Sequence, residues 1–326
     1  MKNLNKTGEI FLKSIELYLL NIHKFFMYMS FPVLGQILGL VLIIIPALFM
    51  RTALPELTAK YSVLADDPVK QFGLVLLTTM PGLILMISAF WKYLVAYVAL
   101  NSMTQSALTS GKVYDFPAHN SIVTRNLGNY IILWCFISIF GLLMFNPILG
   151  ILGGILFIFF ILVFQVFTFE NDKNVFSVLG RSFKLVQKDF FGTMWMSLVF
   201  GIGTYILAEL AKWGLCKIYD CTKFLPQIAQ IIHETDKING INSMFIQLGF
   251  AQYQITTGMI SEVLFGSLVA FLVFGYTLPH RSIFWTLWYK KLTGGEKKVS
   301  AKSPKGKKQL DPEIIRRANL RDDEEV

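Results

Sequence analysis

Apolar side chains dominate this chain in long runs that lack the two-residue alternation of a barrel strand. The longest run lies between Arg125 and Glu170, where 44 residues pass without a charged side chain. A helix rises about 1.5 Å per residue and needs about 20 apolar residues to cross roughly 30 Å of hydrocarbon. Asn146-Pro147 divides the run into two segments of about that length, because proline disfavours a helix at the residue before it. The pattern therefore predicts a membrane hairpin.

Runs of this kind occur six times along the chain, at residues 31–50, 72–98, 129–145, 148–169, 190–208 and 256–278. Lipid offers the backbone no hydrogen bonds, so continuous apolar runs of this length are expected to form helices. We predict an all-α polytopic membrane protein with six transmembrane helices in residues 1–292, followed by a tail at residues 293–326. The composition agrees, since 54% of the residues are hydrophobic and 16% are charged, against about 25% charged in ordinary soluble domains.

Lysine and arginine fall unevenly on the two sides of this predicted membrane domain. If both termini are cytoplasmic, 23 of the 30 basic residues lie inside, and most of the excess is in the tail. Cytoplasmic loops of membrane proteins are enriched in these residues. We therefore expect a multi-pass protein of a bacterial inner membrane with both termini in the cytoplasm.

Two similar amphipathic segments precede the first and fifth spans, around residues 13–26 and 174–191. In the second, the polar stripe includes Arg181, Lys184 and Lys188, and most large apolar residues lie on the opposite face. Such helices lie at the headgroups with their cations extended toward lipid phosphates. We expect interfacial helices on the cytoplasmic face. A third copy at residues 115–126 would make the chain three units of helix plus hairpin, and three unrelated connectors are the alternative.

Two segments rich in aromatic and basic residues, 169–191 and 282–291, resemble bacterial membrane proteins related to the membrane domain of glycerophosphoryl diester phosphodiesterases. The layout of six spans with amphipathic helices before the odd ones matches that group over residues 8–292. In that family the phosphodiesterase is a separate soluble barrel, which takes about 250 residues. The stretch after Lys291 is far shorter. The resemblance therefore implies a fold and leaves the activity open.

Polar residues within the spans are the candidates for a functional site. Ionisable side chains inside a bilayer are costly and call for a functional hypothesis. Glu262 lies in the sixth span after an unusually polar approach, and with Gln254 and Gln165 it could line a polar cleft. The alternative is that the span begins later and leaves Glu262 near the outer headgroups. Gly35-x-x-x-Gly39 and Gly150-x-x-x-Gly154 favour close helix packing within the protein over a dimer interface.

The tail is basic at first and acidic at its end. Its first part is too poor in apolar residues to pack, and Asp311-Pro312 predicts a short helix at residues 312–320. Basic segments beside a membrane bind anionic headgroups, and a protein partner could bind the same tail, whereas this position argues against nucleic acid. The candidate headgroup contacts in the tail are Lys297, Lys298, Lys305, Lys307 and Lys308.

Cysteine and histidine spacing supports no metal or catalytic site. The cysteines are Cys135, Cys216 and Cys221, and the last two could form a local disulfide in an oxidising compartment. We expect no cofactor. The function most consistent with these features is a non-enzymatic membrane protein that organises or senses lipid, or serves as a scaffold. A transporter or lipid-translocating protein using a cleft near Glu262 is the first alternative, and a lipid-headgroup enzyme is the second.

Overall fold

The computed structural model describes residues 2–61, 67–110, 113, 116–144, 149–223 and 257–294, and every regular element in these ranges is helical. Six helical segments are long and apolar enough to cross a membrane, as the sequence predicted. They are Ile22–Ala47, Val69–Thr109, Leu127–Met144, Gly150–Phe169, Phe190–Ile218 and Gly258–Thr293. The first, second, fifth and last exceed the predicted runs because their helices continue past the apolar residues without a break.

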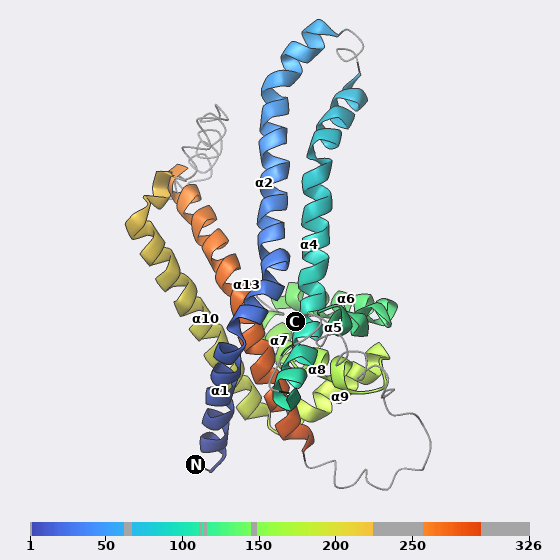
Figure 1. Cartoon of the computed structure of the whole chain (residues 1–326), viewed down its shortest axis with the longest axis vertical. Helices are drawn as coiled ribbons and strands as arrows, with labels where there is room; N and C mark the ends of the chain where they lie inside the picture. Colours follow the sequence, from blue (N-terminus) through green and yellow to red (C-terminus); the bar gives the residue numbers. More distant parts are fainter. Residues whose placement is uncertain are drawn as a thin grey trace, which may run out of the picture.

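These segments form three hairpins (Figure 1). The hairpins pair α2 (Ile22–Lys60) with α4 (Pro68–Ser110), α6 (Leu127–Met144) with α7 (Gly150–Phe159), and α10 (Phe190–Ile218) with α13 (Thr257–Thr293). The shorter elements are α1 (Lys2–Leu20), α5 (Phe116–Thr124), α8 (Val163–Phe169), α9 (Val175–Gln187) and the 3-10 turn η1 (Cys221–Lys223). A shorter helix thus precedes each hairpin: α1, α5 and α9. Whether the three units form a sequence repeat stays a prediction.

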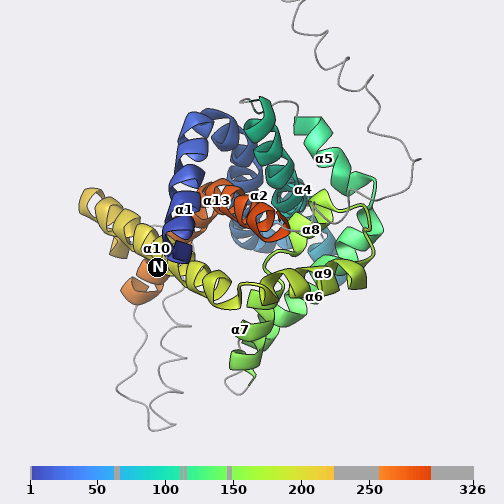
Figure 2. The same cartoon turned by 90° about the horizontal axis from the view of Figure 1, so that it is seen from below.

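The hairpins meet at one end of the molecule, which we call the base. It comprises α1, α5, α8, α9 and the second halves of α4 and α13. Seen from below, α13 lies near the middle of these elements (Figure 2). The largest fully buried side chains of the described residues include Trp288, Phe167 and Phe284 of the base and Tyr130 and Phe25, which pack against it from α6 and α2. The base therefore has a close-packed core of the kind found in soluble domains.

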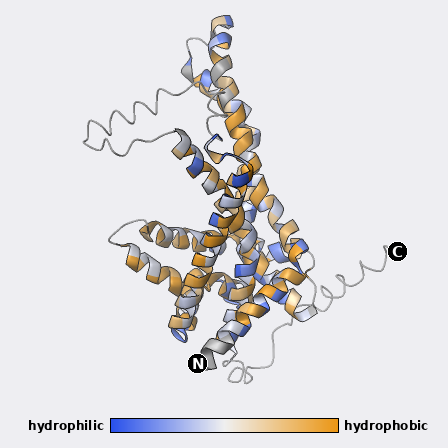
Figure 3. Ribbon diagram, turned by 90° about the vertical axis from the view of Figure 1, so that its left-hand side faces the viewer, coloured by the Kyte–Doolittle hydropathy of each residue, from blue (hydrophilic) through white to orange (hydrophobic). Residues whose placement is uncertain are grey.

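Beyond the base, the hairpins have little protein around them. Only between 11% and 39% of the residues in the apolar window of each span are buried. Hydrophobic residues make up much of the hairpins (Figure 3), and many of their large apolar side chains are exposed. Exposed apolar surface of this extent needs a hydrocarbon environment, so the fold is that of a multi-pass membrane protein.

Small residues let α2 and α4 approach each other closely. A Cβ atom added at Gly35 would lie 2.8 Å from the Cβ of Ala89, and one at Gly39 would lie 2.7 Å from the backbone nitrogen of Met86. The first glycine pair is therefore an internal packing seam, as expected. In the second pair, Gly150 lies against the end of α6, whereas Gly154 faces open space.

The fourth span is not the continuous helix that the sequence suggested. Helix α7 ends at Phe159, and α8 begins at Val163 after a turn in which Val163 N donates to the carbonyl of Phe160 at 3.1 Å. The carbonyl of Phe159 therefore loses its helical partner and accepts from Ser182 Oγ of α9 at 2.9 Å. Backbone groups inside a membrane protein need such replacements. The break directs α8 into the base, where Gln165 becomes buried.

The face of helix α9 that carries most of its apolar residues meets protein rather than lipid alone. Leu179, Leu185 and Val186 are buried, and the ring of Phe183 stacks on Phe159 at 4.4 Å. The sequence pattern could not distinguish these two apolar surroundings, because both select the same spacing. The tail from residue 295 onward, including residues 312–320, lies outside the described residues.

Candidate functional site

A cavity of about 310 Å³ lies where the three hairpins meet the base. Its walls come from α4, α6, α7, α8, α10 and α13 and from the turn between α7 and α8. We call it the central cavity. Its lining residues are Tyr97, Asn101, Trp134, Ile137, Phe140, Phe157, Phe160, Ile161, Phe164, Gln165, Ser197, Phe200, Gly201, Leu278, Arg281, Ser282 and Trp285. The volume falls at the lower end of the range of about 300–1,000 Å³ typical of small-molecule sites.

Aromatic rings form most of its wall. Trp134 packs edge-on against Tyr97 at 5.1 Å and lies 4.9 Å from Phe164, while Phe140 stacks on Phe160 at 5.0 Å. These centroid distances are those of favourable aromatic pairs. Trp134, Phe140 and Phe160 belong to the uncharged run on either side of Asn146-Pro147, so the most apolar part of the sequence provides this wall.

A buried polar cluster forms the other side of the central cavity. Asn101 of α4 is fully buried, and its Oδ1 accepts from Ser282 Oγ at 2.6 Å, Gln165 Nε2 at 3.1 Å and Thr286 Oγ1 at 3.3 Å. Its Nδ2 donates to Thr168 Oγ1 at 3.2 Å. One amide thus joins α4, α8 and α13. Buried polar groups are stable only when they are hydrogen-bonded in this way.

The cavity reaches the surface between α7 and α10. Phe157 of α7 is 43% exposed and Gly201 of α10 is exposed, and both line the cavity. A Cβ atom added at Gly201 would meet nothing within 4 Å. Close to this opening, Ile202 is 57% exposed and Leu198 is 49% exposed. The opening therefore lies on a lipid-facing part of the surface.

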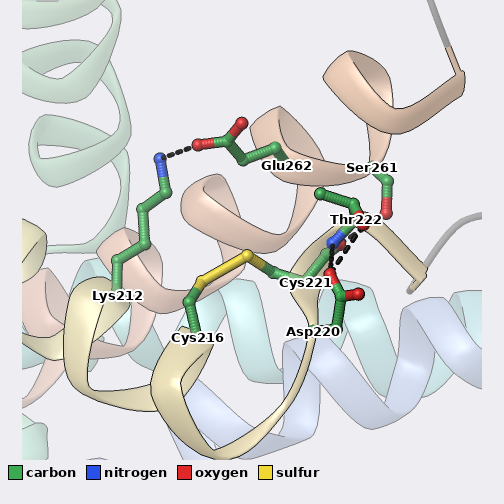
Figure 4. Close-up of a disulfide and its surroundings, with 7 residues drawn as sticks. All are labelled: Lys212, Cys216, Asp220, Cys221, Thr222, Ser261 and Glu262. Atoms are coloured by element: carbon green, nitrogen blue, oxygen red, sulfur yellow. Dashed lines mark hydrogen bonds and ion pairs between the residues drawn. A yellow bond between two sulfur atoms is a disulfide. The ribbon is translucent and has the colours of Figure 1, made fainter.

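The structure separates the sequence-predicted candidates. Gln165 lines the central cavity, whereas Glu262 lies near the start of α13, close to the tip of its hairpin (Figure 4). Ser282, which is bonded to the Asn101 amide, follows Glu262 by 20 residues on the same helix, or about 30 Å. Glu262 and Gln165 therefore do not share one site. Gln254 lies outside the described residues.

Around Glu262 the contacts connect α10 to α13. Its Oε1 lies 3.2 Å from Lys212 Nζ, and the Glu262 side chain is 51% exposed. Nearby, Cys216 and Cys221 form a disulfide, and Ser261 Oγ donates to the carbonyl of Cys221 at 2.7 Å (Figure 4). A half-exposed ion pair contributes little to stability. These contacts hold the two helices together at the hairpin tip.

The three basic candidates on α9 have different surroundings. Arg181 Nε donates to Glu170 Oε1 at 2.8 Å, Lys188 Nζ donates to the carbonyl of Leu292 at 3.3 Å, and Lys184 is exposed. Headgroup contact by these side chains stays a prediction. The tail candidates Lys297, Lys298, Lys305, Lys307 and Lys308 lie outside the described residues.

Beside Arg181, Lys173 closes the end of α8. Its ammonium donates to the carbonyls of Phe167 and Glu170, which α8 leaves unpaired at its C-terminal end. Burial lowers the pKa of Lys173, and the nearby charge of Glu170 opposes that shift. Cations are favourable at helix C-termini because the last carbonyl groups there lack partners within the helix and carry partial negative charge. This contact fixes the loop that leads from α8 into α9.

Asn101, Arg281 and Ser282 are cavity residues that sequence reasoning missed. The predicted sixth span ended at residue 278, which left Arg281 at the membrane–water interface. In the structure, α13 continues to Thr293. A signal was present in the spacing of Ser282 and Thr286, which places two hydroxyls on one helix face. Asn101 gave no comparable signal, because its partners come from two other helices.

Together, the hairpins, the packed base and the central cavity define an all-α polytopic membrane protein with an internal site that opens toward lipid. Comparison with protein-family models, curated proteins and solved structures finds no match for this chain. The resemblance to the membrane domain of glycerophosphoryl diester phosphodiesterases accordingly stays a prediction.

Proposed function

We propose that this chain is a non-enzymatic integral membrane protein that binds a membrane lipid in the central cavity and thereby senses or organises lipid. The observation that carries the proposal is the opening between α7 and α10. An aromatic cavity that reaches a lipid-facing surface can be entered sideways from the bilayer. A water-soluble ligand would have to cross hydrocarbon to reach the same opening.

The proposed orientation places the base on the cytoplasmic side of a bacterial inner membrane and the hairpin tips outside. The distribution of 23 and 7 basic residues supports this arrangement. A disulfide between Cys216 and Cys221 at a hairpin tip also fits an oxidising outer compartment. In this orientation the exposed Lys184 and the basic tail would meet anionic headgroups of the inner leaflet.

Gly201 offers a direct test of the cavity. Gly201 lines the cavity, and a Cβ atom there would enter open space. Leucine also favours helix more than glycine does, so Gly201→Leu is expected to obstruct the site and leave the fold intact. The matched control is Gly203→Leu, because Gly203 is also exposed on α10 with nothing within 4 Å, and it does not line the cavity.

The measurement is the lipid retained per protein after purification in mild detergent, quantified by mass spectrometry of the extracted lipid. Wild type and Gly203→Leu should retain the same lipid, and Gly201→Leu should lose most of it. Equal retention by all three proteins would contradict a lipid site in this cavity. If Gly201→Leu abolished movement of a solute across vesicles with retention unchanged, the transporter alternative would replace the proposal.

A further inference from the structure

Arg281 is a cation in the central cavity without a counter-ion in the described part of the chain. Its Nη2 donates to the carbonyl of Phe274 at 2.8 Å, and its guanidinium lies 5.4 Å from the centre of the Phe274 ring. Among the described residues, no carboxylate lies within ion-pair distance of it. A partly buried cation at this depth is costly unless an anion accompanies it.

Two acids of the base contact α13 at Tyr289 and Lys291, about two turns or more beyond Arg281, and both are engaged there. Glu170 Oε1 accepts from Arg181 at 2.8 Å and from Tyr289 at 3.0 Å. Asp189 Oδ1 accepts from the backbone of Gly192 at 3.1 Å, and its Oδ2 pairs with Lys291 at 3.1 Å. These acids therefore cannot neutralise Arg281 without breaking their own contacts.

Three buried polar atoms of cavity residues lack a hydrogen-bond partner among the described residues. They are Arg281 Nε, Trp134 Nε1 and Gln165 Oε1. Gln165 is only 4% exposed, and its amide nitrogen is held by Asn101. Buried donors and acceptors in native proteins are nearly always paired. An arginine and one further donor, with one acceptor in the same cavity, are complementary to an acidic group that carries a neighbouring hydroxyl.

We infer that the lipid bound in the central cavity is acidic, that its anionic group pairs with Arg281 and accepts from Trp134 Nε1, and that a hydroxyl of its headgroup donates to Gln165 Oε1. This inference rests on the proposed lipid-binding function and adds the chemical class of the ligand. The acyl chain lies along Phe140, Phe157 and Phe160 and leaves through the opening between α7 and α10. An anionic phospholipid and a free fatty acid share the acidic group and the chain, but only the phospholipid headgroup supplies the hydroxyl.

The test measures binding to the full-length protein in detergent with three probes: phosphatidylglycerol, phosphatidylcholine and oleate. Charge-assisted hydrogen bonds favour the acidic ligand by about tenfold or more, so wild type should bind phosphatidylglycerol at least that much more tightly than phosphatidylcholine. Tight oleate binding with weak phosphatidylglycerol binding would support the pairing of an acidic group with Arg281, identify a free acid as the ligand and overturn the headgroup hydroxyl at Gln165. The reverse would support that pairing and identify the phospholipid.

Substitutions of cavity residues test whether the preference for acidic lipid arises in the central cavity. Arg281→Gln should remove the preference for acidic lipid and retain binding of phosphatidylcholine, and Arg281→Lys should restore part of it. Lys92→Gln is the control, because it removes one positive charge from the exposed side of α4, outside the cavity. If Arg281→Gln does not fold, Trp134→Phe removes one donor without changing charge and should weaken acidic-lipid binding several-fold.

The two levels of the proposal fail in distinguishable ways. Equal wild-type affinity for phosphatidylglycerol, oleate and phosphatidylcholine, with binding still lost in Gly201→Leu, would overturn the acidic class and leave the lipid site standing. Binding of all three probes that Gly201→Leu does not change would overturn the lipid site itself.

Discussion

At the scale of single residues, a side chain of one helix satisfies a backbone carbonyl in another. Ser182 Oγ of α9 donates to the Phe159 carbonyl at the break between α7 and α8, and Ser182 is fully buried. This hydrogen bond stabilises the turn that orients Gln165 toward Asn101. One hydroxyl thus supports the break and the polar side of the central cavity next to it.

Ser182→Ala is expected to lower the free energy of unfolding by about 1–3 kcal/mol, because the Phe159 carbonyl would remain buried without a partner. Thermal unfolding of the detergent-solubilised protein measures the effect. Ser177→Ala, on the exposed face of the same helix, should change stability much less. Equal effects of the two substitutions would show that the Phe159 carbonyl finds another partner.

The cysteines allow a second prediction at this scale. With Cys216 and Cys221 joined and Cys135 free, a thiol reagent added to the denatured, unreduced protein should modify Cys135 alone. Reduction should expose the other two thiols. Mass spectrometry counts the modified sites, and Cys216→Ser should free Cys221 without reductant. Three reactive thiols before reduction would exclude the disulfide in the protein as isolated.

At the scale of helices, α2 and α4 depend on glycine where their backbones approach. A Cβ atom at Gly39 would lie within 2.8 Å of three atoms of Met86, two of them backbone, and one at Gly82 would meet the backbone of Leu42 and Ile43 at 2.7 Å. Apolar association inside a membrane has little hydrophobic driving force, so close packing of this kind holds helices together.

Gly39→Ala should therefore destabilise the protein by about 1–3 kcal/mol through overpacking. Gly73→Ala is the matched control, since Gly73 also lies in this hairpin, on α4, and a Cβ there would meet nothing within 4 Å. This control should be neutral or stabilising by up to about 1 kcal/mol, because alanine favours helix. Unfolding temperatures of the two variants should thus move in opposite directions. A stabilised Gly39→Ala protein would contradict the seam.

At the scale of the whole molecule, the three hairpins share one base and expose most of their remaining surface. This arrangement leaves the central cavity at the junction instead of a dry bundle interior. It also places the C-terminal end of α2 far from α9 along the structure (Figure 1). Tyr61 directly follows α2, and Gln187 is the last residue of α9.

The proposed orientation predicts that Tyr61→Cys reacts with a membrane-impermeant maleimide added outside intact cells, whereas Gln187→Cys does not. Both positions are exposed, and both variants should react after the membrane is permeabilised. Cys135→Ser provides the background for the labelling. Labelling of Gln187→Cys alone in intact cells would reverse the proposed topology.

The sequence by itself determined that this protein needs a lipid environment and that it has six segments able to cross a membrane. Runs such as residues 126–169 need hydrocarbon around them and a helical backbone whatever their neighbours are. It also indicated Gly35 and Gly39 as a packing seam, because two glycines four residues apart leave one helix face open to a close neighbour wherever that neighbour comes from. Helix boundaries were less accurate, because polar residues such as Arg281 can continue an apolar helix when the protein around them provides contacts.

Only the tertiary structure decided which polar residues meet. Asn101, Gln165 and Ser282 are far apart in the chain, and their hydrogen bonds form because α8 turns into the base and α13 crosses α4 there. Glu262 was the more conspicuous residue in the sequence, yet it is half-exposed and pairs with Lys212 of the neighbouring helix. The sequence of one helix reveals that burying a polar side chain would cost free energy. The hydrogen-bond partner that offsets this cost comes from another helix, and only the tertiary structure identifies it.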